Sequence, residues 1–168
     1  TIREALTRLA PLVNGSDAVL GVGPSLVAGL DAKVPGLHEF PDLSREGVRV
    51  PSTPGTLWVW VRGDDLGDLL MLTRKVQKAL APAFAVRHVV DAFRHAVGES
   101  GHGKDLTGFE DGTENPTGEK AEEAAFAHGQ GEGIDGSSYV AVQQWVHDLD
   151  AFEALGGEGA NHHFGPHP

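Results

Sequence analysis

The residues best suited to chemistry lie in one polar loop, residues 106–116, with the sequence Leu-Thr-Gly-Phe-Glu-Asp-Gly-Thr-Glu-Asn-Pro. Gly108, Gly112 and Pro116 allow this backbone to turn tightly and to approach a ligand closely. Asp111 stands between them, and its carboxylate has two interpretations. It could close a turn by accepting hydrogen bonds from its own main chain, or it could act as a general acid and base beside a bound substrate.

Two tryptophans and several histidines could also take part in chemistry. Trp58 and Trp60 stand two residues apart in a β-prone run, so both would lie on one face of a strand. They could pack in a core or relay electrons to a buried oxidant. Six histidines are spread along the chain without the paired spacing of a zinc site, which favours surface or structural roles: His38, His88, His95, His102, His128 and His147.

The composition argues against several classes of partner. The 24 acidic and 13 basic side chains give a net charge of -11, which repels nucleic-acid phosphates and anionic lipid. The chain has no cysteine, which excludes disulfides, thiolate ligation of heme and cysteine-held iron–sulfur clusters. The sequence has neither an apolar run of membrane length nor a signal-peptide pattern. We therefore predict a cytoplasmic protein, and the start at Thr1 suggests that a longer product begins upstream.

The elements before the loop predict an α+β unit. Hydrophobic spacing and the positions of glycine and proline indicate, in order, a helix over 2–13, a strand over 18–23, an irregular segment over 30–54, a central strand over 56–62, a helix over 64–80 and a strand over 85–93. This order lacks only the leading strand of a β-α-β-β-α-β ferredoxin-like unit. We expect that strand to lie before Thr1 or to come from another chain.

The elements after the loop predict the beginning of a second unit. They are a helix over 119–127, a glycine-rich connector over 129–136, a strand over 138–147 and a helix capped by Asp148. Three parts follow. Residues 1–105 form an N-terminal ferredoxin-like unit with helices on one face of an antiparallel sheet, residues 106–136 form the loop and connector, and residues 137–168 begin a second such unit and end in a histidine-rich tail.

The loop also carries a family resemblance. Gly108-Phe-Glu-Asp-Gly112, followed by Thr-Glu-Asn-Pro, resembles the GxxDG signature of the dye-decolorizing peroxidases. The likeness extends to Asp91-Ala-Phe-Arg-His before the loop and to residues 136–150 after it, so it reaches well beyond the loop on both sides. It implies two ferredoxin-like halves with heme b between them, hydrogen peroxide as oxidant, and an organic dye or phenolic compound as reductant.

The resemblance also implies site residues. Asp111 would be the distal acid and base, moving a proton from one oxygen of hydrogen peroxide to the other so that water leaves. Glu110, Asp111, Gly112 and Thr113 would lie against the heme. The family's proximal histidine and distal arginine normally lie further downstream, in a region that this sequence does not contain. Imidazole is the usual axial ligand of heme iron, so the tail offers candidates, although such tails are more often solvated or bound to adventitious metal: His162, His163 and His167.

Functions from different classes therefore stay open. The first is a heme peroxidase, which by the same resemblance would form homo-oligomers and could be packaged in a protein shell. The second is a truncated, catalytically impaired ferredoxin-like domain that serves in binding or assembly. A third is an acidic module that binds metal through its histidine tail.

Overall fold

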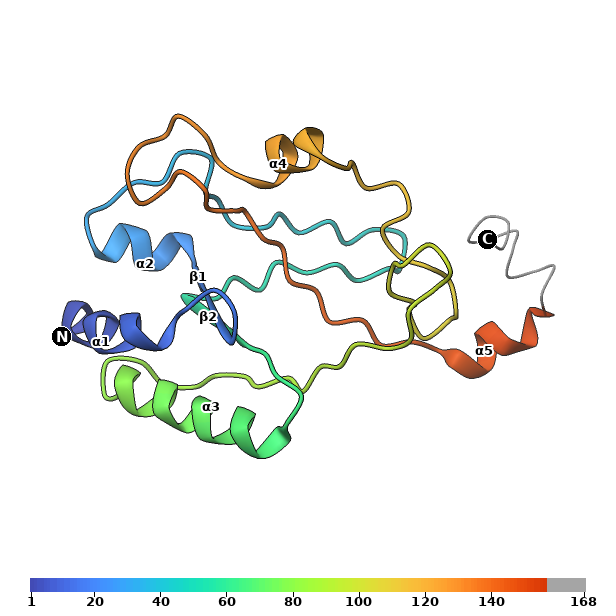
Figure 1. The fold of residues 1–168 in the computed structure, drawn as a ribbon, viewed down its shortest axis with the longest axis horizontal. Coiled ribbons are helices and arrows are strands. Elements are labelled where there is room, and N and C mark those ends of the chain that lie inside the picture. The colour runs from blue at the N-terminus through green and yellow to red at the C-terminus, as the bar shows by residue number, and fades with distance from the viewer. Residues whose placement is uncertain (157–168) are drawn as a thin grey trace. The chain divides into compact units, whose positions relative to one another are not determined.

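The computed structural model describes residues 1–156, which divide into two compact units, Thr1–Val89 and a second that begins at Val90 (Figure 1). The first unit contains, in order, α1 (Ile2–Leu9), the 3-10 helix η1 (Ala10–Leu12), β1 (Ala18–Val22), α2 (Pro24–Gly29), β2 (Leu57–Val61) and α3 (Leu66–Leu80). The second contains α4 (Glu119–Ala125) and α5 (Leu149–Ala154). The division after residues 105 and 136 stays a prediction.

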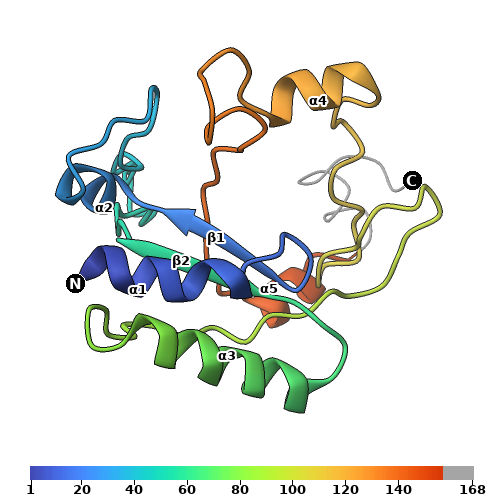
Figure 2. The ribbon, with the colours of Figure 1, turned by 60° about the vertical axis from the view of Figure 1, so that its left-hand side comes forward.

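The first unit is built on an antiparallel pair of strands with helices on one side. β1 and β2 pair so that Ala18 lies opposite Val61 and Val22 opposite Leu57. Leu9 of α1 and Val76 of α3 are buried, and Leu20 and Val59 of the strands pack against them. Figures 1 and 2 both show α1 running alongside α3. The predicted helices and both of these strands are confirmed, and so is the placement of helices on one face.

Helix ends in this unit follow ordinary capping chemistry. The Asp65 carboxylate accepts a hydrogen bond from the Asp68 amide at 2.9 Å, which caps the start of α3. At the other end of α3, the Arg8 guanidinium of α1 donates to the carbonyls of Ala79 at 3.0 Å and Ala81 at 2.9 Å. These bonds satisfy carbonyls that have no partner within the helix, and they join α1 to α3. Among residues 1–156, no helix is long and apolar enough to cross a membrane.

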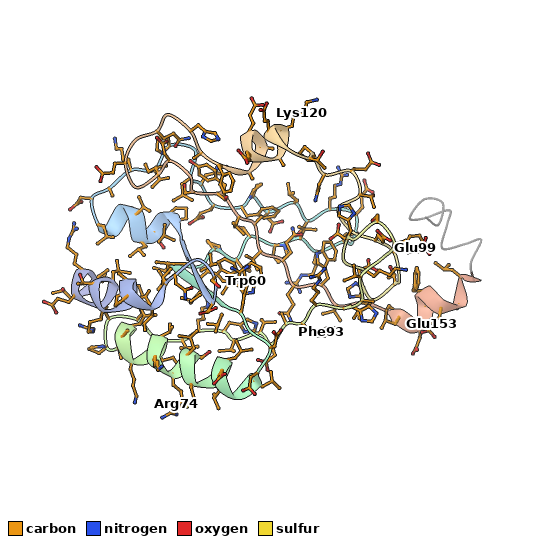
Figure 3. The ribbon with its side chains drawn as sticks, viewed as in Figure 1. Trp60, Arg74, Phe93, Glu99, Lys120 and Glu153 are labelled. Atoms are coloured by element: carbon orange, nitrogen blue, oxygen red, sulfur yellow. The ribbon has the colours of Figure 1, made fainter. Side chains whose placement is uncertain are left out.

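The tryptophans lie outside the helix-covered core. Trp58 and Trp60 alternate with Leu57 and Val59 along β2, so they project from the opposite face of the sheet. Their rings stack with centroids 5.9 Å apart, and the Arg62 guanidinium lies 4.7 Å from the Trp60 ring centroid. Trp60 is 46% exposed (Figure 3). Core packing is therefore wrong for Trp60, whereas Trp58 is half-buried, and electron relay stays a prediction.

Three local expectations differ from the structure. Residues 85–93 and 138–147 have no strand, and β2 has β1 as its partner within residues 1–156, so it is not a central strand. A strand needs a neighbour that accepts and donates backbone hydrogen bonds, and residues 85–93 and 140–147 have no backbone hydrogen bond in the described part of the chain. Their β-prone side chains stay exposed, Phe93 at 74% and Val146 at 92%. Figure 3 labels Phe93. The short helix α2 was not predicted, because Pro24 at its first turn reads equally well as a loop residue.

Candidate functional site

The polar loop belongs to a small antiparallel meander in the second unit. Isolated bridges pair Val97 with Gly103 and Lys104 with Glu110. The Asp111 amide donates to the Gly103 carbonyl at 2.9 Å, and the Lys104 amide donates to the Ala96 carbonyl at 2.8 Å. Three successive passes of the chain therefore hold the backbone of Asp111 in place.

The side chain of Asp111 is available for chemistry. The residue is exposed, and within residues 1–156 its carboxylate has no hydrogen-bond or ion-pair partner. The turn-forming role falls instead to Asp105, whose carboxylate accepts from the Thr107 amide at 2.8 Å and from the Thr107 hydroxyl at 2.5 Å. The Asp111 carboxylate therefore closes no turn within residues 1–156, and its role as acid and base stays a prediction.

Phe109 fixes the loop to the rest of the second unit. It is the most buried residue of the loop, at 9% exposed, and its ring meets the Phe152 ring of α5 edge-on, with centroids 6.5 Å apart. Such aromatic contacts supply both buried apolar area and a preferred geometry. The loop thus has a buried anchor two residues before the exposed Asp111.

Gly112 is required by the shape of the loop. Its φ is +93°, and a Cβ atom at this position would lie 2.9 Å from Asn115 Nδ2. We expect Gly112→Ala to lower the free energy of unfolding by roughly the 1–2 kcal/mol that a positive φ costs an L-residue, because the exposed Asn115 side chain can move away from the added methyl group. Gly108→Ala is the matched comparison, because Gly108 has a φ of +90° and open space around its missing side chain. Denaturant unfolding followed by circular dichroism measures both, and a loss that is much larger in Gly112→Ala than in Gly108→Ala would contradict this account.

Glu110 makes a separate cluster on the inner side of the meander. Its side chain is 1% exposed. The carboxylate accepts from the Ser100 amide at 3.3 Å and from the Ser100 hydroxyl. His102 joins the cluster, with Nδ1 2.8 Å from the Ser100 hydroxyl and 4.0 Å from the Glu110 carboxylate. The oxygens of Glu110 therefore face this cluster.

Known proteins are similar to this chain over a region that includes the loop. Residues 102–166, which include it, match the family model described as Dyp-type peroxidase, C-terminal. A dye-decolorizing peroxidase of Brevibacterium linens is 35% identical over 151 residues, which cover 89% of this chain and 40% of that protein. A dye-decolorizing peroxidase of Mycobacterium tuberculosis (strain ATCC 25618 / H37Rv) is 30% identical over 166 residues, covering 92% and 48% respectively. The chain belongs to the dye-decolorizing peroxidase family.

The fold agrees with this membership. The structure of DypB N246A in complex with manganese superposes with a TM-score of 0.73 and 34% identity, over 86% of this chain and 46% of that chain. The α+β, ferredoxin-like fold class predicted from the sequence is thereby confirmed. The chain spans less than half the length of these curated relatives.

Family membership leaves the individual site residues as predictions. Within the loop, Asp111 and Thr113 are exposed and Gly112 is half-buried, whereas the Glu110 carboxylate is turned toward Ser100 and His102. Among residues 1–156 no three histidine or acidic side chains gather closely enough to hold a metal ion. The tail candidates lie outside the described residues: His162, His163 and His167.

Sequence reasoning missed the partners of Glu110. Ser100 and His102 precede it by ten and eight residues and carry no motif of their own. The available signal was the glycine spacing of residues 98–103, Gly-Glu-Ser-Gly-His-Gly, which is typical of a tight turn between two antiparallel passes. Such a turn brings its central side chains back toward the passes on either side.

Proposed function

We propose that this chain is part of a heme-dependent peroxidase that reduces hydrogen peroxide and oxidises organic dyes or phenolic compounds, with Asp111 as its distal acid and base. The observation that carries the proposal is the carboxylate of Asp111, exposed and without a partner within residues 1–156, in a segment that matches the family model. A general acid and base must have its oxygens free to reach the substrate.

The loop is compatible with a porphyrin beside it. Asp111 and Thr113, on either side of Gly112, are both exposed, so a flat group could reach the loop at these two residues. These three residues would form the distal wall. A bound heme b would supply redox-active iron and the electrons that break the O–O bond. Its axial ligand is not assigned among residues 1–156, and the tail histidines remain the candidates.

The contribution of this chain is a proton transfer. A carboxylate oxygen of Asp111 takes a proton from one oxygen of hydrogen peroxide and gives it to the other, which then leaves as water. Asp111 is thereby returned to its carboxylate form, ready for the next molecule of peroxide. The hydrogen bond from the Asp111 amide to the Gly103 carbonyl, 2.9 Å long, holds the backbone of this residue while its side chain carries the proton.

The experiment that tests cofactor binding is a titration of the full chain with hemin, followed by absorption spectroscopy. We expect a Soret band that saturates near one heme per chain. Heme that stays in the unbound form at every ratio tested would reject the peroxidase assignment for this chain. It would leave the family membership unchanged, because membership depends on sequence and fold.

The second candidate is a ferredoxin-like domain for binding or assembly that lacks catalysis. It is favoured by the segments 85–93 and 140–147, which carry exposed apolar side chains and have no backbone hydrogen bond within residues 1–156. Segments of this kind can pair with strands of another chain. Oligomers that persist in sedimentation without hemin, together with a failed titration, would support this candidate.

We further propose that the protein acts in the cytoplasm with peroxide and a small organic reductant, as a homo-oligomer that could be enclosed in a protein shell. The net charge of -11 supports the exclusion of nucleic acid and anionic membranes as partners.

A further inference from the structure

The carboxylate of Glu110 is buried and accepts hydrogen bonds from the turn at residues 98–102. The Glu110 side chain is 1% exposed, although it carries a carboxylate that water would solvate well. Burial of such a group is costly unless hydrogen bonds compensate it. Here the Ser100 amide and hydroxyl both donate hydrogen bonds to the carboxylate, and the hydrogen bond from the amide is 3.3 Å long. Hydrogen bonds to the turn at residues 98–102 thus replace the carboxylate's hydrogen bonds to water.

A glycine leaves room for this cluster. A Cβ atom on Gly98 would overlap the carboxylate of Glu110, so the close approach depends on glycine at this position. Glu110 is itself a neighbour of Asp111, and the His102 ring lies near the other neighbour, 3.5 Å from the place where a Cβ atom of Gly112 would stand. The cluster therefore lies close to the chain on both sides of Asp111.

The position of Asp111 depends on its backbone alone. Within residues 1–156 its carboxylate has no partner that could orient it, so its geometry follows from the neighbouring residues and from the bond of its amide to Gly103. A small displacement of a catalytic group can cost a large factor in rate. A contact that fixes the adjacent residue therefore bears directly on the reaction.

We propose that Glu110 is a positioning residue, which through Ser100 and His102 ties the turn at residues 98–102 to the signature loop and so fixes the location of Asp111. This inference rests on the proposed function, because it gives Glu110 a role in aligning the acid and base of that reaction. It differs from the role implied by the family resemblance, in which Glu110 lies against the heme.

Amide hydrogen exchange of the full chain without heme tests the contact directly. We expect Glu110→Ala to speed exchange of the Asp111 amide by about tenfold or more, the factor associated with losing a hydrogen bond to a charged group. Glu110→Gln keeps an acceptor for the Ser100 amide and should stay within about threefold of the parent chain. Glu99→Ala is the matched control, since Glu99 is an exposed neighbour in the same turn (Figure 3).

Two results would overturn the proposal. One is equal exchange of the Asp111 amide in Glu110→Ala and Glu99→Ala, and the other is a Gln variant that behaves like the Ala variant. If Glu110→Ala proves unfolded, Ser100→Ala decides the question, because it removes the hydroxyl donor alone and should still speed exchange at Asp111. Parent-like exchange in that variant would contradict the proposal.

Activity of the hemin-loaded protein provides an independent measurement. We expect Glu110→Ala to lower kcat for peroxide reduction with little change in KM for the organic reductant, and Glu110→Gln to recover most of kcat. Failure of the hemin titration would reject the proposed function and leave the exchange result intact, so the two failures are distinguishable.

Discussion

Replacement of Asp111 by asparagine is expected to abolish peroxide turnover while hemin uptake stays unchanged. Asparagine has nearly the same shape but cannot exchange a proton, so the substitution removes the acid and base alone. We expect kcat/KM for hydrogen peroxide to fall by about 10²–10⁴-fold, the usual contribution of a positioned acid or base. The measurement is the initial rate of dye oxidation by the hemin-loaded variant, with the Soret band confirming equal heme content.

Glu114→Gln provides the control for this experiment. Glu114 is an exposed carboxylate three residues further along the same loop, and it has no partner in the described part of the chain. The substitution changes the net charge by the same amount as Asp111→Asn, so it separates a general charge effect from a specific one. Parent-like activity in Asp111→Asn, or an equal loss in Glu114→Gln, would contradict the role of Asp111.

The largest effect on stability is expected from Leu9→Ala. Leu9 of α1 is fully buried in the core cluster with Val76 of α3, against which Leu20 and Val59 of the sheet also pack. The substitution removes buried apolar contacts and leaves a cavity that such neighbours fill only in part. We expect a loss of about 2–5 kcal/mol in the free energy of unfolding of the first unit.

Denaturant unfolding in a Trp145→Phe background measures this loss, because the fluorescence then comes from Trp58 and Trp60 of the first unit. Leu66→Ala is the matched control, because Leu66 begins α3 and is 82% exposed. We expect a change within about 0.5 kcal/mol there, as for most surface substitutions. Similar losses in the two variants would show that Leu9 is not the centre of the core.

Much of the first unit could be predicted because its signals are local. The apolar spacing of α1 and α3 and the acids before α3 identify both helices, and the predicted start of α3 is two residues early. The alternation in β2 identified which residues share a face, but it could not say which face would be covered. The helices cover the side of Leu57 and Val59, so Trp58 and Trp60 lie on the other side.

The segments 85–93 and 138–147 show the limit of local reasoning. Their side chains favour strands, yet a strand exists only when a second backbone forms hydrogen bonds with it, and among the described residues no such bonds reach 85–93 or 140–147. Propensity states what a segment can form. Pairing depends on residues that lie elsewhere, in this chain or in another.

For the site, the sequence by itself determined the chemistry that is present: one carboxylate among glycines, no cysteine, and a signature shared with the dye-decolorizing peroxidases. The tertiary structure decided where those groups lie and what they contact. Asp105, not Asp111, accepts the hydrogen bonds that close the turn, the Asp111 carboxylate has no partner within residues 1–156, and Glu110 contacts Ser100, which also contacts His102. The physical reason is that hydrogen bonds between passes of a meander depend on register, which no single segment encodes.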